Sequence, residues 1–481
     1  MNKYLAFKVS TKPVTYLFLP IFYHFPLIII KFDGIIFLKN SIKFTTIQRV
    51  CSWQQLNSFN EKEQVNQMNA ALYQEIQKYM QMKNWNKTEL SRESGIHVSE
   101  ISRILNHKQP LSLQYLDALT HALGLSEGTF YPYYIEECLN EGNRADKRRS
   151  IKFLYKCVAE GYKKHSKDLV NVMLEEKSKT IRKKNLFYIF SVAERVFREG
   201  KGEKALPLYE VVIESDLDRF SEQVAISYFR RFYIVRGTDK GQHALSYVLD
   251  QLAYMPTEIR QEACMWIMAD YYRREEWGQV LNYAEKLEKM EDVGEYYGRA
   301  LMYKGFALSR LGGSLEEVLG IIKKYAQVNH FYAEMAVGNR YVALLDFGQL
   351  EYVDEYLSWL EIRDDIYAGL PRIFETYIQL NRLEDAKKLI DRFKHVIRDM
   401  SVSKEPWLKE KRYLDFRYAH ALFQCKNSKY DEGLNELLEV ADSSMKIGNI
   451  ERLKKCLVAF WLYRAYATPQ HDEKYCKILS T

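Results

Sequence analysis

Residues 85–131 have the sequence WNKTELSRESGIHVSEISRILNHKQPLSLQYLDALTHALGLSEGTFY, in which helix caps and apolar positions recur at helical spacing. Asn86 can cap a helix that begins at Lys87, and Glu89, three residues further on, can complete a capping box. Gly95 follows this short helix, and glycine commonly ends helices because it adopts a positive φ without steric cost. The pattern therefore predicts a helix of about two turns that ends at a glycine.

Two more helices are predicted after this glycine. His97 or Ser99 can begin the second helix, in which Ile101, Ile104 and Leu105 have the i, i+3, i+4 spacing of one buried face. The third is amphipathic, with Leu113, Leu116, Leu119 and Leu123 on one face and Gly124 at its end. Two short helices joined by a glycine-containing turn, with a polar exposed half on the second, are typical of a helix-turn-helix. The alternative is two helices of an ordinary bundle, and the number of matching positions favours the helix-turn-helix.

Length and composition indicate an all-α protein. The chain has 481 residues, with only 22 glycines and 10 prolines, and 47% of its residues are hydrophobic. So few helix breakers favour helices throughout, and the length requires two or more domains or a repeat array. The seven cysteines are scattered, without a C-x-x-C pair, which favours buried thiols over a metal or redox site. They are Cys51, Cys138, Cys157, Cys264, Cys425, Cys456 and Cys476.

Residues 1–67 differ in character from the rest of the chain. The apolar run at residues 14–30 is interrupted by two prolines and a histidine, and it is short for a membrane span. Lys62-Glu63 is compatible with codons that form a ribosome-binding sequence shortly before Met68. We therefore expect translation to begin at Met68, with residues 1–67 a non-native upstream translation or a disordered apolar extension. A membrane anchor is the alternative.

A DNA-binding domain is predicted over residues 68–140, and a basic hinge with connecting helices over residues 141–184. Residues 144–184 contain 14 lysines and arginines against five acids, a net charge of +9. Such a run is either a solvated helix face or a surface that follows phosphates beside the second helix of the motif, and both interpretations stay open. Glu141, Gly142 and Asn143 are the predicted joint between the domains.

From residue 185 to residue 481 a turn followed by a small apolar residue recurs, which predicts stacked helix pairs. The recurring residues are Ala205, Ala244, Val280, Val318, Val353, Ala386 and Gly433. Their intervals of 39, 36, 38, 35, 33 and 47 centre near the tetratricopeptide period of 34. We expect about seven pairs and a capping pair at residues 450–479, stacked into a right-handed α-solenoid. An unrelated α-bundle is the alternative, and the recurring period favours the stacked pairs.

The first helices of such pairs would line a concave groove suited to an extended peptide. Asn339 is notable because its amide can pair with a peptide backbone through donor and acceptor together, although a surface or core role is the commoner one for such a residue. The residues predicted near this inner face are Arg198, Tyr233, Tyr272, Arg273, Arg310, Asn339, Arg340, Asp346 and Gln379.

Residues 87–91 (KTELS) and 95–106 (GIHVSEISRILN) resemble the Xre/Cro family of repressor-type DNA-binding domains. Together with the repeats, they resemble the peptide-pheromone receptors of Gram-positive bacteria (the Rgg, Rap, NprR, PlcR and PrgX group, with the phage arbitrium receptors). The resemblance covers Met68 to the C-terminus. It implies a cytoplasmic homodimer, without a membrane partner, that binds a short imported peptide and then changes its affinity for an operator.

The resemblance also assigns DNA contacts. Val98, Ser99 and Arg103 would face base edges, and Lys87 and Asn106 would approach phosphates. The full set is Lys87, Thr88, His97, Val98, Ser99, Ser102, Arg103, Asn106 and Lys108.

Catalysis is not expected. The sequence contains no GxxxxGK[ST], H-E-x-x-H or G-x-S-x-G pattern and no histidine cluster at metal-ligand spacing, so we expect no metal and no cofactor. Two alternatives to a peptide-controlled regulator stay open. One is Rap- or NprR-like action on a phosphorelay response regulator, and the other is a DNA-tethered scaffold for protein interactions.

Overall fold

A computed structural model describes residues 71–140, 144–238, 240–403 and 407–480. Within these ranges all regular elements are helices, and the single β-type pairing is an isolated bridge between Leu139 and Ala145. Residues 72–481 form one compact unit. The predictions for residues 1–67, for Cys51 and for Glu141–Asn143 lie outside the described residues.

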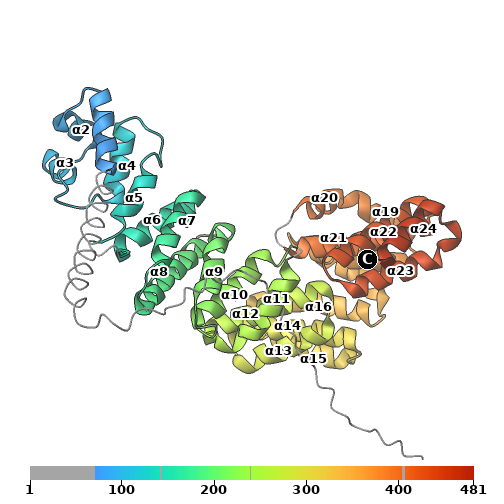
Figure 1. The fold of residues 1–481 in the computed structure, drawn as a ribbon. Coiled ribbons are helices and arrows are strands. Elements are labelled where there is room, and N and C mark those ends of the chain that lie inside the picture. Colours follow the sequence, from blue (N-terminus) through green and yellow to red (C-terminus); the bar gives the residue numbers. More distant parts are fainter. Residues whose placement is uncertain (1–70, 141–143, 239, 404–406, 481) are drawn as a thin grey trace, which may run out of the picture. The chain divides into compact units, whose positions relative to one another are not determined.

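The N-terminal domain begins with helical residues 71–82 and continues as α2 (Lys87–Ser94), α3 (Val98–Leu105), α4 (Leu113–Ala122) and α5 (Tyr131–Glu137) (Figure 1). The predicted capping box is present, because the side chain of Asn86 accepts from Glu89 N at 3.1 Å and that of Glu89 accepts from the Asn86 N–H. Gly95 has φ 70°, as predicted. Of the two candidates for the start of α3, His97 is the N-cap.

The segments on either side of the predicted joint contact each other. Asp146 N donates to the Cys138 carbonyl at 2.8 Å, next to the Leu139–Ala145 bridge, so the flanking residues are held together. The ring of Tyr131 also packs edge-on against Phe153, with centroids 5.1 Å apart. The DNA-binding domain therefore packs against residues that follow the joint.

Two helices beyond the joint, α6 (Lys147–Glu160) and α7 (Lys163–Leu174), continue the core of the N-terminal domain without a break. Lys156 of α6 binds both Asp117 of α4 and Glu127, each at 2.6 Å. The apolar cluster that begins at Leu72 extends into the first helix pairs of the repeat region. Any movement of the DNA-binding domain must therefore carry these helices with it.

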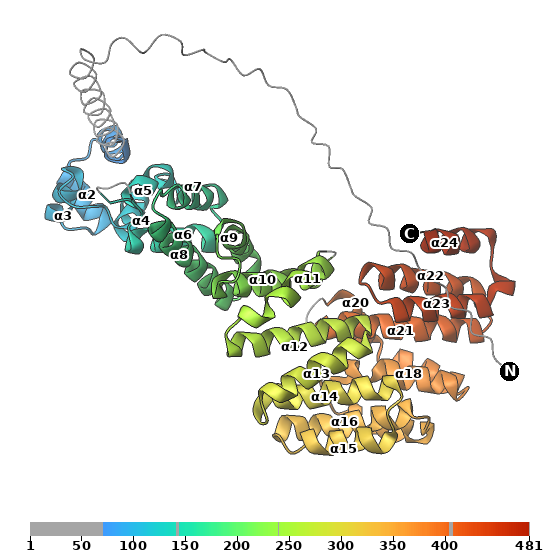
Figure 2. The ribbon, with the colours of Figure 1, turned by 60° about the horizontal axis from the view of Figure 1, so that its bottom comes forward.

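The rest of the chain is a succession of helix pairs (Figures 1 and 2). In chain order they are α8 (Lys179–Arg198) with α9 (Gly202–Ser215), α10 (Glu222–Val235) with α11 (Gly241–Gln251), α12 (Thr257–Arg274) with α13 (Trp277–Met290), α14 (Gly294–Leu311) with α15 (Leu315–Tyr325), α16 (His330–Asp346) with α17 (Val353–Leu360), α18 (Leu370–Gln379) with α19 (Leu383–Arg392), and α21 (Trp407–Lys426) with α22 (Tyr430–Lys446). The predicted capping pair follows as α23 (Ile450–Leu462) and α24 (Pro469–Ser480), both of which pack against α22.

The seven recurring small residues explain why these pairs form. Each is buried, and each is the fourth residue of the second helix of its pair, counting for α17 from the 3₁₀ turn Leu350–Tyr352. A small side chain there lets the second helix pack closely on the first. The long interval before Gly433 contains an additional helix, α20 (Lys394–Val402). The predicted all-α fold, a helix-turn-helix domain followed by a helical repeat region, is confirmed.

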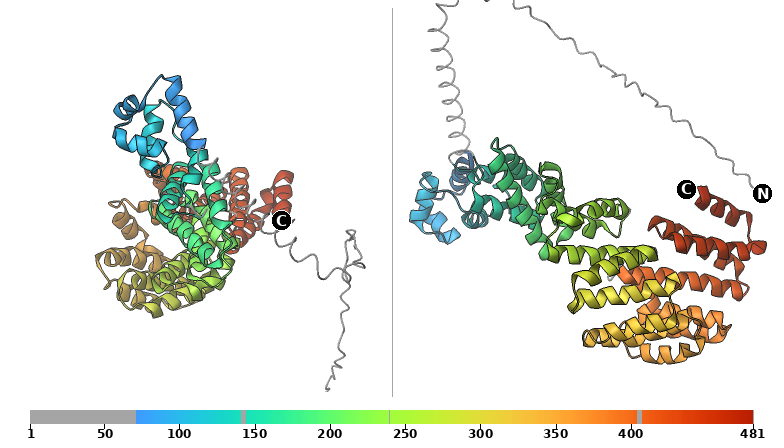
Figure 3. Two further views of the ribbon diagram at one scale, coloured as in Figure 1. Left: turned by 60° about the vertical axis from the view of Figure 1, so that its left-hand side comes forward. Right: turned by 90° about the horizontal axis from the view of Figure 1, so that it is seen from below.

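Helices distant in sequence are also joined, at the C-terminal end of α12 (Figures 2 and 3). Glu275 lies there in the left-handed region with φ 59°, and its carboxylate accepts from Lys411 Nζ of α21 at 3.0 Å and from Arg452 Nη2 of α23 at 2.8 Å. Asp415 of α21 binds the same two cations. We call Glu275, Lys411, Asp415 and Arg452 the clasp, because they connect the third pair to the seventh and to the capping pair.

The interpretation of the cysteines as buried thiols holds for Cys138, Cys157, Cys264, Cys425 and Cys456, and is wrong for Cys476, which is exposed. Burial raises the pKa of the Cys264 thiol to about 11 and that of Cys456 to about 12, so both are protonated at neutral pH.

Candidate nucleic-acid interface and ligand pocket

The exposed half of α3 is the candidate recognition surface. Ile101, Ile104 and Leu105 are buried on one face of this helix, which leaves Val98 and Arg103 exposed on the other. The turn that leads into α3 is fixed by α2, because Ser91 Oγ donates to the Ile96 carbonyl at 2.6 Å. The helix is therefore held with its polar half toward solvent, the arrangement that major-groove contact requires.

Polar residues of α2 and α3 form one surface cluster. Ser102 Oγ accepts from Asn106 Nδ2 at 3.3 Å and lies 3.5 Å from Lys87 Nζ. Thr88 is exposed at the start of α2, where its N–H is capped by Asn86. A lysine and an amide held together beside a helix N-terminus suit a phosphate group. These predicted contacts thus lie on one continuous surface, although their binding to DNA stays a prediction.

The predicted base-reading residue Arg103 is paired within the free protein. Its Nη1 lies 3.0 Å from Glu100 Oε1, and the other oxygen of Glu100 accepts from Gln109 Nε2 at 2.6 Å. The arginine side chain is 59% exposed, so the pair contributes at most about 1 kcal/mol and can open on DNA. The roles of Glu100 and Gln109 were missed at the sequence level, although i, i+3 spacing from Arg103 could have indicated the first of them.

The two ends of α3 contain the remaining predicted DNA contacts. His97 Nδ1 lies 2.7 Å from Ser99 Oγ and accepts from Ser99 N at 3.3 Å, so the imidazole is a helix cap and is also exposed. Lys108 is exposed just after the helix, and its N–H donates to the Arg103 carbonyl at 2.8 Å. Both residues can reach a ligand without disturbing the core.

The basic segment over residues 144–184 divides into internal and external charges. Lys156 is half-buried between two carboxylates, and Arg149 donates to the Leu139 carbonyl at 3.0 Å, so these two stabilise the fold. Eleven other cations are exposed, namely Arg144, Lys147, Arg148, Lys152, Lys163, Lys164, Lys167, Lys177, Lys179, Lys183 and Lys184. The phosphate-binding and solvated interpretations both stay open for this exposed set.

Two of the residues predicted for the peptide groove have structural roles instead. Arg273 is buried, pairs with Asp270 at 2.9 Å and donates to the Arg236 carbonyl at 2.8 Å. Tyr272 is also buried, and its hydroxyl accepts from Arg412 Nη2 at 3.0 Å. Periodicity places both residues on α12 but does not reveal these partners. Both side chains are therefore bound to partners within the protein, and their contact with a peptide stays a prediction.

Arg310 and Asp346 are brought together by the fold. Arg310 Nη2 lies 2.8 Å from Asp346 Oδ2, and Arg372 contacts the other oxygen of the same carboxylate. Only 4% of the aspartate side chain is exposed, against 37% for Arg310. The arginine is therefore the accessible member of this group and faces solvent over the ring of Trp277, with the guanidinium carbon 6.0 Å from the ring centroid.

The remaining predicted groove residues do not share one site. Asn339 Nδ2 donates to the hydroxyl of buried Tyr325 at 2.9 Å, so its amide is partly used inside the protein. The ring of Tyr233 packs against that of Trp266, whereas Arg198 and Arg340 are exposed. Gln379 is the one member of the set that lines the cavity described next.

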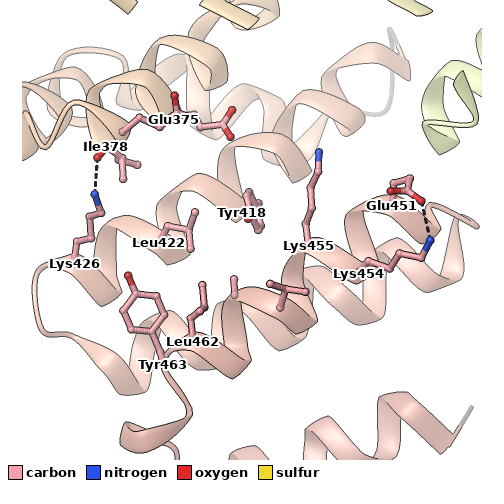
Figure 4. A pocket seen from close by; sticks show the side chains of 13 residues that line it. Glu375, Ile378, Tyr418, Leu422, Lys426, Glu451, Lys454, Lys455, Leu462 and Tyr463 are labelled. Atoms are coloured by element: carbon pink, nitrogen blue, oxygen red, sulfur yellow. Dashed lines mark hydrogen bonds and ion pairs between the residues drawn. The ribbon is translucent and has the colours of Figure 1, made fainter. Parts of the chain in front are cut away.

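A cavity of about 410 Å³ lies between three first helices, α18, α21 and α23 (Figure 4). Apolar side chains form its floor, and lysines and glutamates stand at its edges. Its lining includes Ile378, Gln379, Tyr418, Leu422, Lys455, Val458 and Leu462. We call this cavity the α23 pocket. It was missed at the sequence level because half of it belongs to the capping pair, where no recurring residue marks an inner face.

Comparison with known proteins identifies one domain. Residues 76–130 match a helix-turn-helix family, over a range that includes α2 and the helices α3 and α4 that pack against it. No curated protein matches the chain. The chain therefore carries a helix-turn-helix domain of the Xre type, as found in DNA-binding regulators. None of the described helices has the length and apolar character that a membrane span needs, and the described residues contain no cluster of metal-ligating side chains.

Proposed function

We propose that this protein is a sequence-specific transcriptional regulator whose affinity for DNA is set by a short peptide bound on the first helices of its repeat region. The helix-turn-helix domain supports the DNA-binding part. The observation that supports the peptide part is the α23 pocket, because three successive first helices contribute to it. A ligand on such a surface contacts several helix pairs at once and can alter their packing.

The active form is a homodimer in the cytoplasm. Helix-turn-helix proteins bind two half-sites whose centres lie about 34 Å apart or a multiple of that distance, so two copies of α3 are needed. Each chain supplies one copy. The repeat region is the part large enough to join two chains, and it therefore sets the separation of the two recognition helices.

The signal travels through packed helices. Because α6 and α7 share a core with the DNA-binding domain, a change in the packing of the pairs displaces α3 directly. A coupling free energy of about 1–3 kcal/mol would change DNA affinity by about 5- to 150-fold. By reciprocity, operator DNA changes peptide affinity by the same factor.

The test is a pair of calorimetric titrations with a candidate signalling peptide, with and without the operator. We expect the two peptide affinities to differ, and equal affinities would refute the coupling. Gln379→Ala should weaken peptide binding, since this amide lies at the pocket and is exposed. Arg340→Ala, which changes an exposed first-helix residue outside that pocket, is the matched control.

A further inference from the structure

The floor of the α23 pocket is unusually exposed for an apolar surface. Val458 and Leu462 lie one turn apart on α23 and are 61% and 75% exposed. Ile378 of α18 and Leu422 of α21 line the same cavity (Figure 4). Large apolar side chains left in water around a cavity are typical of a binding surface.

The carboxylates of this pocket are neutralised within the protein. Glu375 accepts from Arg372 Nη1 at 2.8 Å, and Glu451 accepts from Lys454 Nζ at 2.9 Å. Neither carboxylate therefore needs a cation from a ligand.

Among the described residues, one lysine of the pocket has a neutral partner and another shares its carboxylate with other cations. Lys426 Nζ donates to the Ile378 carbonyl at 2.8 Å, which is a neutral acceptor. Lys455 Nζ lies 3.9 Å from Glu275, a carboxylate that two cations of the clasp already bind at 2.8 and 3.0 Å. The pocket therefore has positive charge to offer a ligand.

We infer that the α23 pocket binds a short peptide with a large apolar residue and at least two carboxylates, its side-chain or C-terminal groups, which Lys455 and Lys426 receive. This inference rests on the proposed function and specifies the chemistry of the ligand. Lys455 and Lys426 stand at opposite ends of the apolar floor (Figure 4). A fatty acid has one carboxylate and would use only one of them.

The same pocket connects the ligand to the clasp. Lys455 lines the cavity and also approaches Glu275, and Tyr418 lines the cavity while Arg452 of the clasp lies over its ring at 5.5 Å. A carboxylate that draws Lys455 toward the ligand removes the outermost cation from Glu275. Peptide binding thereby alters the contact between α12 and α23.

The experiment is affinity selection of random hexapeptides with free C-termini by the full chain. We expect the retained peptides to be enriched in large apolar residues and in Asp or Glu. Lys455→Met should abolish the acidic enrichment and weaken the binding of the best peptides about fivefold. The reason is that the ion pair between a peptide carboxylate and the half-exposed Lys455 is lost. Lys446→Met is the control, since Lys446 is exposed on α22 and does not line the pocket. It should change nothing.

The outcomes separate this inference from the proposed function. If no peptide is retained, the proposed function fails and the inference fails with it. Retained peptides whose acidic enrichment survives Lys455→Met would overturn the inference alone. Two further results would also overturn it. One is displacement of the selected peptides by octanoate at equal concentration, and the other is loss of self-association in Leu462→Asp without loss of peptide binding.

Discussion

Replacing Glu275 with glutamine removes one charge from the clasp while preserving the size of the side chain. The backbone at this position has φ 59°, and glutamine and glutamate tolerate that conformation equally, so the substitution isolates the charge. After the change, Lys411 and Arg452 share Asp415 as their remaining clasp carboxylate. Both cations are almost fully buried, so solvent does not compensate the loss.

The loss of stability in Glu275→Gln follows both from the lowered pKa of Glu275 and from the cost of breaking a buried ion pair. Burial alone would raise the pKa of Glu275 above its ordinary value of 4.5, but Lys411 and Arg452 outweigh burial and hold the pKa at about 2. That difference corresponds to about 3 kcal/mol of stability at neutral pH. Removing one partner of a buried ion pair independently costs about 3–5 kcal/mol. We therefore expect Glu275→Gln to lower the free energy of unfolding by about 3 kcal/mol.

The pH dependence follows from the sign of the shift. A carboxylate with a lowered pKa stabilises the folded state fully above its unfolded pKa, here about 4.5, and this contribution is lost as the pH falls toward 2. The measurement is urea unfolding at pH 7 and at pH 3, since urea, unlike guanidinium chloride, does not screen charges. The difference in the free energy of unfolding between the wild type and Glu275→Gln should be smaller at pH 3 than at pH 7.

The control is Glu276→Gln, one residue further on. Glu276 is about 43% exposed and lies 3.9 Å from Arg274, so its loss should cost no more than about 1 kcal/mol. If Glu275→Gln and Glu276→Gln unfold at the same urea concentration at pH 7, the clasp contributes no stability and the reasoning is refuted.

Two further predictions concern other parts of the chain. Arg103→Ala should reduce the free energy of binding to the operator by about 1–3 kcal/mol and relax specificity at one base pair. Glu100→Gln should strengthen binding to random DNA roughly threefold, because it frees Arg103 from its ion pair. Gel-shift titrations with operator and random DNA measure both, and equal losses on the two DNAs in Arg103→Ala would make this residue a phosphate contact. Gly298→Ala should destabilise the protein, because an added Cβ would lie 2.4 Å from the ring of buried Tyr332. At Gly320 an added Cβ would meet no atom within 4 Å, so Gly320→Ala should stabilise its helix by about 1 kcal/mol. Thermal unfolding measures the stability of both variants. A higher melting temperature for Gly298→Ala than for Gly320→Ala would contradict the close contact between Gly298 and Tyr332.

Features that depend on neighbours in sequence were predictable. Asn86 caps α2 and Gly95 ends it because capping depends on a few adjacent residues. The small residues such as Ala205 and Ala386 marked the helix pairs correctly because each must fit against the helix just before it. For the same reason the sequence indicated the exposed half of α3.

Features that depend on distant partners could not be predicted. Arg273 was expected in a groove because helical periodicity gives a face and does not give the carboxylate, Asp270, that holds the side chain. The clasp joins Glu275 to residues 136 and 177 positions away, and no local pattern relates them. The α23 pocket was missed because exposed residues such as Leu462 resemble ordinary surface positions until the neighbouring helices are placed.

The clasp also changes how this repeat region can fold. In a linear repeat array each unit touches its neighbours alone, so folding can begin at any unit and spread, and the ends can fray separately. Here the third pair cannot complete its contacts until α21 and α23, synthesised much later, have formed. Contacts across such separations slow folding, because chain entropy is lost before they form. In return, the clasp links helix pairs that are far apart in sequence, so that α21 and α23 stabilise a helix synthesised long before them.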